Sequence, residues 1–332
     1  MKIELETFRK KIVQKNIPSL LMFKPAIRNY VWGGRKLLAL AEPDASKNNN
    51  PIAEVWAVYE NNPVINGFYA GRTLGDLVSE YPYEILGTHV VAGSNEHFPL
   101  LIKLLDCERW LSLQVHPNDD QARQLEGPQF VGKTEAWHII NAQSRAQLIG
   151  GIKPKINIET LHSAVGNERI LDLVNYHNVQ TNDTIFMPAG TIHALGPGLL
   201  VYEVQQTSDL TYRVFDWNRP QSDGRVLHIE KSIAAINPQS QGQIIRQRNF
   251  SGTTTSLVRC PYFNLEILSV PHERDTFGKS FHALTVTSGE ARISTRDSEM
   301  LLHKFDTILV SAVCGSYSLD GNFQILCSSI SD

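Results

Sequence analysis

The chain has 332 residues, of which 42% are hydrophobic and 20% charged, and its formal net charge is −3. This composition is typical of a globular protein with a sizeable core, and the charge balance argues against a nucleic-acid-binding surface or a polybasic membrane anchor. No apolar run is long enough to cross a bilayer, so we expect no membrane span. The four cysteines form no Cys-x-x-Cys pair, which argues against a disulfide framework and makes a reducing cytoplasm the expected setting.

Two stretches of the N-terminal part are expected to be helical. Residues 1–20 have mixed charge and no apolar signal core, which predicts a short amphipathic extension. A second helical or irregular stretch is predicted over 73–86, ending near Gly87.

Most of the remaining chain consists of short apolar runs separated by Gly, Pro, Asn and Asp, a pattern that favours a sandwich or barrel over a doubly wound sheet. The exception is a helical insertion predicted at about 157–178, where apolar residues recur at helical spacing. The predicted strands cover 98–105, 110–116, 146–152, 183–189 and 199–206.

A faint internal repeat links residues 182–195 (NDTIFMPAGTIHAL) and 305–319 (FDTILVSAVCGSYSL). Both begin an apolar run with Asp-Thr-Ile, although chance similarity between two buried strands would give the same pattern. We interpret the repeat as a duplicated β-barrel, with a boundary inside the polar stretch 236–255. The second copy lacks the Pro and the His of the first, so it is expected to have no metal site.

The segment LSLQVHP at 111–117 alternates strictly, so that Ser112, Gln114 and His116 share one face of a strand. A half-exposed strand would also place polar residues on one face. An amide oxygen and an imidazole two positions apart, however, lie about 7 Å apart along the chain and can converge on one ion.

Two further segments complete a candidate metal site. In GKTEAW, Lys133 and Glu135 share a face, which alone is most often a surface ion pair. In the segment at 182–193, a Pro-x-Gly turn is followed by His193, and the turn returns the chain so that the imidazole faces into the barrel. This segment resembles the second motif of the cupin superfamily.

Gln114, His116, Glu135 and His193 match the order of cupin metal ligands, with Gln in place of a common His and a longer gap before the Glu. Two imidazoles, a carboxylate and an amide oxygen suit one Zn²⁺ per chain with a position left for water or substrate. The same ligands can hold Fe²⁺, Mn²⁺ or Co²⁺.

Both departures are features of the type I phosphomannose isomerases in their shorter bacterial form, which the chain resembles. The matching segments are FPLLIKLLD (98–106), LSLQVHPND (111–119), GKTEAWHII (132–140), the long run at 187–219 and LHIEKS (227–232). One smaller departure is Ala53, where the family usually has Gly before Glu54.

The resemblance implies a mainly β fold of two cupin-type jelly rolls with a small helical insertion. The expected domains are an N-terminal extension at 1–20, a catalytic barrel at 21–245 with the insert at about 157–178, and a second barrel at 246–332 without a metal site. The implied reaction interconverts mannose 6-phosphate and fructose 6-phosphate through an enediol, and a metal ion would stabilise the charge that develops on oxygen.

The resemblance also assigns roles to polar residues. It implies that Lys103, aided by Ser112, binds the substrate phosphate, although a lysine within an apolar strand can also snorkel at the strand end. The other family positions are Arg213, Lys133 and Asp209 as catalytic residues, Glu203 as a pocket carboxylate and Arg219 as a weaker phosphate contact.

Two other functions remain open from the residues alone. A non-haem iron cupin oxygenase also uses two His and a carboxylate, but it does not need Gln114 or the cationic residues. A sugar-phosphate-binding cupin without catalysis is the non-enzymatic alternative. The expected partner is a small sugar phosphate, with neither nucleic acid nor membrane, and the sequence does not distinguish a monomer from a homodimer.

Overall fold

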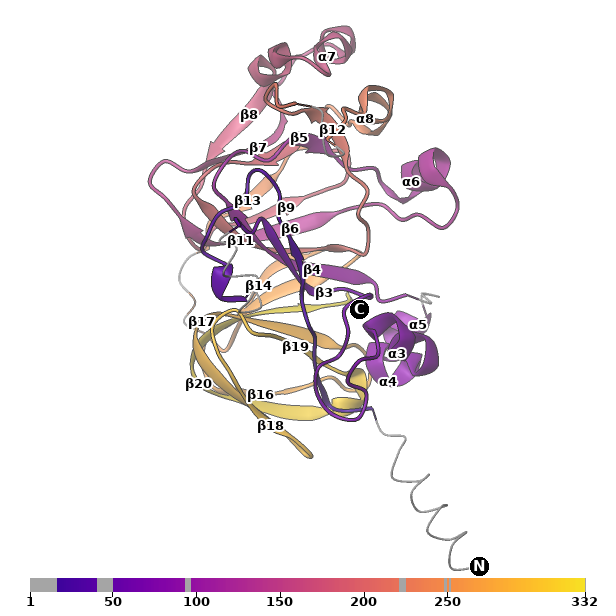
Figure 1. The fold of residues 1–332 in the computed structure, drawn as a ribbon, viewed down its shortest axis with the longest axis vertical. Coiled ribbons are helices and arrows are strands. Elements are labelled where there is room, and N and C mark those ends of the chain that lie inside the picture. The colour runs from indigo at the N-terminus through magenta and orange to yellow at the C-terminus, as the bar shows by residue number, and fades with distance from the viewer. Residues whose placement is uncertain are drawn as a thin grey trace, which may run out of the picture.

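The computed structural model describes residues 17–40, 50–92, 97–220, 225–247, 250 and 252–331. Most of the extension predicted at 1–20 therefore lies outside the described residues. Within the described residues the protein is mainly β, as predicted, and its strands form three antiparallel sheets (Figure 1).

The first barrel is built from two sheets. The seven-stranded sheet has the order β13-β9-β6-β11-β4-β3-β2, and the five-stranded sheet has the order β12-β5-β10-β7-β8. Their strands are β2 (Ala26–Arg28), β3 (Glu54–Val58), β4 (Leu100–Cys107), β5 (Leu113–Val115), β6 (Glu135–Ala142), β7 (Gln147–Ile152), β8 (Val174–Asn178), β9 (Thr184–Met187), β10 (His193–Leu195), β11 (Leu199–Gln206), β12 (Tyr212–Phe215) and β13 (Gln243–Ile245).

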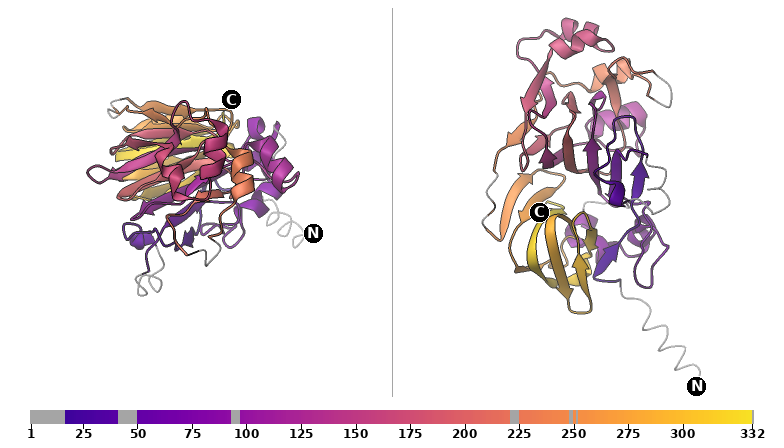
Figure 2. Two further views of the ribbon diagram at one scale, coloured as in Figure 1. Left: turned by 90° about the horizontal axis from the view of Figure 1, so that it is seen from above. Right: turned by 60° about the vertical axis from the view of Figure 1, so that its left-hand side comes forward.

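The second barrel is one eight-stranded sheet that curves on itself, with the central order β1-β19-β17-β20-β15-β14. Figure 2 shows it as the orange and yellow unit beside the first barrel. Its strands are β1 (Leu20–Met22), β14 (Thr254–Arg259), β15 (Asn264–Leu268), β16 (His272–Asp275), β17 (His282–Thr295), β18 (Glu299–Leu302), β19 (Thr307–Val310) and β20 (Ser316–Ser329).

The two barrels repeat one pairing scheme. The path β9-β6-β11-β4-β3 in the first corresponds to β19-β17-β20-β15-β14 in the second. The turns before β9 and β19 match in detail: Asn182 and Phe305 have φ of 70° and 75°, and the aspartates that follow them each accept a hydrogen bond from the backbone N–H three residues earlier. The predicted correspondence between 182–195 and 305–319 is therefore confirmed by the pairing.

This correspondence extends to individual residues in the second barrel. Tyr317 pairs with Arg274, as His193 pairs with Gln114. His282 pairs with Val310 and Glu135 pairs with Met187, and each partner is the third residue after the Asp-Thr of its repeat. Three of the positions predicted as metal ligands in the first barrel thus correspond to Arg274, His282 and Tyr317 in the second. The Arg274 guanidinium donates to Glu266 at 2.8 Å.

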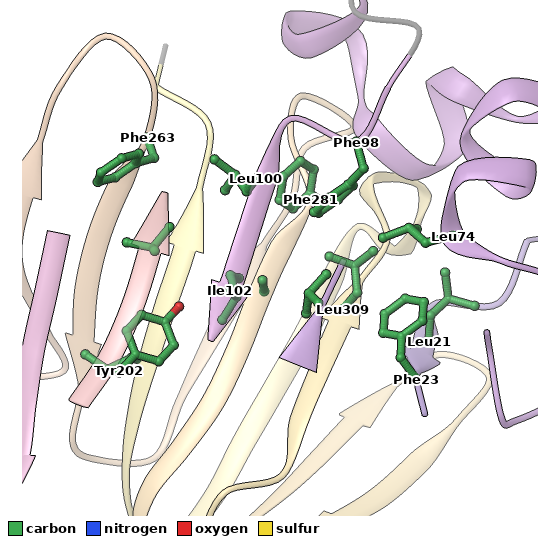
Figure 3. Close-up of a cluster of buried hydrophobic side chains, with 14 of the residues drawn as sticks. Leu21, Phe23, Leu74, Phe98, Leu100, Ile102, Tyr202, Phe263, Phe281 and Leu309 are labelled. Atoms are coloured by element: carbon green, nitrogen blue, oxygen red, sulfur yellow. The ribbon is translucent and has the colours of Figure 1, made fainter. Parts of the chain in front are cut away.

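Apolar side chains cover both outer faces of the first barrel. On β4, Leu100, Ile102 and Leu104 point away from the barrel interior and pack against the second barrel, for example against Phe281 (Figure 3). The alternate residue Lys103 therefore points into the first barrel. On the opposite side, helix α7 (Ile158–Ala164) and helix α8 (Ile229–Ala235) cover the five-stranded sheet.

The helices agree with the prediction at 73–86 and differ from the predicted helices elsewhere. Helix α3 (Leu74–Glu80) and helix α4 (Pro82–Leu86) form as predicted, followed by α5 (Thr88–Ala92). In the insert, α7 and the 3-10 turn η2 (Glu168–Asp172) are helical, but Val174–Asn178 is strand β8, because it pairs with the edge of β7. Short 3-10 turns also occur at η1 (Leu38–Leu40) and η3 (Ala312–Cys314). No helix in the described ranges is long and apolar enough to span a membrane.

Helix α6 (Asp119–Glu126) was not predicted. Its signal lies in the sequence, because Asn118 and Gln121 form a reciprocal capping box at its N-terminus. The strand predicted at 110–116 is correspondingly shorter and covers only Leu113–Val115.

The domain limits at 245 and 246 stay a proposal. Strand β13 pairs with β9 of the first barrel and β14 with β15 of the second, which supports a boundary between Ile245 and Thr254. Strand β1, however, pairs with β19, so the N-terminal segment belongs to the sheet of the second barrel rather than to the first.

Replacing Phe281 with alanine should reduce the free energy of unfolding by about 3–5 kcal/mol. Its ring is fully buried and lies 4.7 Å from that of Phe98, across the contact between the barrels. A urea unfolding curve measures the effect. Phe277→Ala is the matched control, because Phe277 is 75% exposed and its loss should change stability by no more than about 0.5 kcal/mol. Equal effects of the two variants would contradict the assigned core.

Candidate metal centre and substrate cavity

Three buried side chains from different strands converge inside the first barrel. One ligand atom each from His116, Glu135 and His193 lies within 4.8 Å of the others. His116 follows β5, Glu135 opens β6 and His193 opens β10. The predicted turn brings the last of these into place: Gly190 has φ of 84°, a conformation that favours glycine, and its N–H donates to the carbonyl of His116 at 2.8 Å. Gln114 pairs with His193 in register.

Both imidazoles are oriented by the backbone. His116 Nδ1 lies 2.8 Å from the carbonyl oxygen of Leu210, and His193 Nδ1 lies 2.8 Å from that of Thr191. A carbonyl can only accept, so each Nδ1 carries the proton and each Nε2 presents a lone pair to the centre. Burial lowers the pKa of both rings, that of His193 to about 3, and favours the neutral form.

The donor set fits a metal ion. Glu135 Oε1 is buried without a hydrogen-bond partner and lies 3.2 Å from His193 Nε2, so two acceptor atoms face each other with no donor between them. A shared cation satisfies such atoms. The amide nitrogen of Gln114 donates to the same Nε2 at 3.2 Å, so the amide must turn over to present its oxygen to an ion. The ammonium of Lys133 lies 2.7 Å from Glu135 Oε2 and 3.0 Å from His116 Nε2.

A cavity of about 530 Å³ opens onto this cluster. On its inner wall, Lys103 Nζ lies 3.1 Å from Glu203 and 3.6 Å from Glu54. Burial alone would raise the pKa of Glu203, but the charges of Lys103 and Lys133 lower it below the ordinary value. The ammonium of Lys103 is therefore already compensated by two carboxylates.

The cavity lining also holds basic side chains that differ in how far they are paired. Arg213 and Arg225 line the cavity, as does His228. Arg225 forms two hydrogen bonds of 2.7 Å with Asp216, whereas Arg213 Nε is buried and has no hydrogen-bond partner. A buried N–H without an acceptor is costly unless a ligand supplies one, so this part of the lining suits an anionic or oxygen-rich ligand.

Most of the predicted site residues meet in this one cavity. Gln114 and the pocket residues Ser112, Lys103, Lys133, Glu203, Asp209 and Arg213 line it. Arg219 does not: its guanidinium donates to Asp216 at 3.2 Å and to the carbonyl of Trp110 at 2.7 Å.

Four titratable lining residues were not predicted from the sequence: Tyr30, Glu54, Arg225 and His228. The sequence carried a signal for one of them. Glu54 follows Ala53, the departure from the family noted above, but no local pattern marks it: it opens strand β3 and is buried. His228 stands in LHIEKS, a segment of the family resemblance. Tyr30 and Arg225 reach the cavity from loops, and no local pattern marks them.

A barrel of two antiparallel sheets that encloses such a cluster defines a cupin with a metal-ligating site. Residues 20–136 match the family described as phosphomannose isomerase type I, catalytic domain, and residues 253–330 match the mannose-6-phosphate isomerase cupin domain. The mannose-6-phosphate isomerase ManA of Bacillus subtilis (strain 168) is 32% identical over 318 residues, which cover 93% of this chain and 98% of that relative. The chain belongs to the mannose-6-phosphate isomerase family, whose members are aldose–ketose isomerases.

Solved structures agree with this assignment. The mannose 6-phosphate isomerase from Bacillus subtilis has a TM-score of 0.81 at 29% identity, over 94% of this chain and 99% of that one. A structure described as mannose 6-phosphate isomerase in a zinc-bound holo form has a TM-score of 0.75 at 16% identity, over 95% and 100% of the two chains. The second comparison shows a shared fold.

Proposed function

We propose that the protein interconverts mannose 6-phosphate and fructose 6-phosphate through an enediol, at one Zn²⁺ held by Gln114, His116, Glu135 and His193. The observation that carries the proposal is the pair of facing acceptors, Glu135 Oε1 and His193 Nε2, which lie next to two residues of the cavity lining, Lys133 and Gln114. Two imidazoles with a carboxylate suit zinc, and the structural neighbour described as zinc-bound supports this choice.

When bound, zinc acts as a Lewis acid that stabilises negative charge on the substrate oxygens. Isomerisation must move two protons: one leaves C2 of the open-chain aldose as the enediol forms and is returned at C1, and the other passes from the C2 hydroxyl to the C1 oxygen. We assign the transfer from C2 to C1 to Asp209, an exposed carboxylate in the cavity wall. Glu203 and Glu54 are the other carboxylates of the cavity lining, and a selective loss of kcat in Glu203→Gln would move the role to Glu203.

Two cationic residues are assigned to the developing charge. Arg213 offers the unpartnered Nε and lies beside Gln114 in register, so its guanidinium can stabilise the enediolate. Lys133 lies between His116 and Glu135, where it orients the carboxylate and faces the reacting end of the sugar.

The phosphate contact of Lys103 and Ser112 remains a proposal taken from the family resemblance, and Arg219 is a weaker candidate that lies outside the cavity lining. Lys103 is bound by Glu54 and Glu203, and carboxylates repel a phosphate. A phosphate at this position needs Lys103 to exchange one of these partners for the ligand.

The deciding experiment is a coupled assay that converts fructose 6-phosphate to mannose 6-phosphate. We expect turnover in the protein as purified, loss after chelation, and recovery when about one equivalent of zinc per chain is returned. Oxygen consumption, measured in parallel, should stay at background. Metal-replete protein without isomerase activity would refute the proposal. The free cysteines of the structure agree with the expected cytoplasmic setting.

A further inference from the structure

Strand β12 forms an edge of the five-stranded sheet, and one histidine binds the backbone of Arg213 at that edge. On its inner side β12 pairs with β5, where Arg213 lies opposite Gln114. On its outer side the carbonyl of Arg213 accepts from the N–H of His228 at 2.9 Å, and the N–H of Arg213 donates to His228 Nδ1 at 3.1 Å. Both backbone groups of Arg213 that face away from the sheet are therefore bound by one residue.

The same segment also holds the side chain of Arg213. Its NH1 donates to the carbonyl of Val226 at 3.0 Å, two residues before His228. Arg225, which lies next to Val226, is fixed to Asp216 by two hydrogen bonds. The guanidinium is thus anchored at one nitrogen, while its Nε remains buried and unpartnered beside the cavity.

The chemistry of the His228 ring fits this task. An imidazole that accepts a hydrogen bond at Nδ1 must be neutral and carry its proton on Nε2. Burial, followed by the charge of Arg213, lowers the pKa of His228 and favours the neutral form. His228 is also the N-cap residue of α8, but its side chain makes no capping hydrogen bond there. The helix therefore does not explain why an imidazole stands at this position.

We infer that His228 is a positioning residue for Arg213, acting through the hydrogen bond from the Arg213 N–H to Nδ1. With both backbone groups fixed, the guanidinium projects from one place on β12 toward the cavity opposite Gln114. Without the imidazole, β12 keeps its pairing with β5 but loses the restraint on the residue that carries the guanidinium. The inference rests on the proposed function, since Arg213 is there assigned to charge that develops only during isomerisation.

The test is a double-mutant cycle on zinc-loaded enzyme. His228→Ala should lower kcat by about 10- to 100-fold, because small displacements of a positioned group have effects of this size, with KM changed much less. His228→Asn should recover most of the loss, since its Oδ1 can accept the same hydrogen bond. In an Arg213→Ala background, His228→Ala should cost little more, because the residue that it positions is gone.

Two controls separate this role from a general loss of stability. Zinc content and the thermal unfolding midpoint are measured for each variant, and His303→Ala, an exposed histidine of the second barrel, should leave kcat unchanged. The inference is overturned by an unchanged kcat in His228→Ala, by no recovery in His228→Asn, or by a full loss in the Arg213→Ala background. An inactive metal-replete wild type would instead refute the proposed function.

Discussion

Replacing His193 with alanine is expected to abolish isomerisation and to remove most of the bound metal while both barrels remain folded. His193 supplies one of two imidazole nitrogens at the centre, and loss of a partner that only orients a ligand already costs about 10- to 100-fold in metal affinity. The fold should persist because β10 is held to β5 and β7 through backbone hydrogen bonds. Metal analysis, circular dichroism and the coupled assay measure the three effects.

The chain offers a matched control for this variant. His282 is also a buried histidine at a barrel interior, at the position of the second barrel that corresponds to Glu135. His282→Ala removes a similar volume and should leave zinc content and turnover near those of the wild type. The assigned centre is wrong if His193→Ala keeps stoichiometric zinc and full activity, or if His282→Ala loses both.

Replacing Arg213 with alanine is expected to lower kcat by about 10²–10³-fold, as for the loss of a donor that stabilises an oxyanion. Arg213 lines the cavity and its Nε has no partner, and charge on the sugar oxygens develops only as the enediolate forms. Zinc content should be unchanged, because Arg213 is not a ligand. Steady-state kinetics measure the effect, and a substrate deuterated at C2 shows whether proton transfer limits the rate.

Lys103→Ala provides the comparison. If Lys103 contacts the phosphate, a group that the reaction leaves unchanged, the variant mainly raises KM. If its main partners are instead Glu54 and Glu203, as in the structure, kcat and stability fall together. A rise in KM alone for Arg213→Ala, together with a fall in kcat alone for Lys103→Ala, would reverse the two assignments and the orientation of the substrate.

The metal ligands that we propose could be selected from the sequence because they stand in local patterns: an alternating strand for Gln114 and His116, and a Pro-x-Gly turn before His193. Most predicted strands are also present in the structure, because each is a short apolar run bounded by turn residues. Glu54 was beyond local reasoning, because it meets Lys103 only through the pairing of β3 with β4. Arg219 is the converse case: the sequence placed it with the cavity residues, but its guanidinium is bound by Asp216 and the Trp110 carbonyl, and it does not line the cavity.

Other differences also come from tertiary contacts. The 157–178 stretch has apolar residues at helical spacing, yet its last part pairs with β7 as strand β8, because an exposed sheet edge offers backbone hydrogen bonds that a short isolated helix cannot match. His228 stands in a segment of the family resemblance. Its hydrogen bonds to Arg213, however, join residues 15 positions apart, and no local sequence pattern predicts them.

Duplication has given the two barrels different sources of buried positive charge. In the first, Lys133 binds one oxygen of Glu135, and the other oxygen, Oε1, has no partner, so the metal ion that we propose there would arrive from solution and could leave again. In the second, Arg274 binds Glu266, so the counter-charge is attached to the polypeptide and cannot be removed by a chelator. Metal starvation should therefore leave the second barrel intact, and the apolar face of β4 that it covers stays hidden from water. The protein without metal should therefore expose no large apolar surface that favours aggregation.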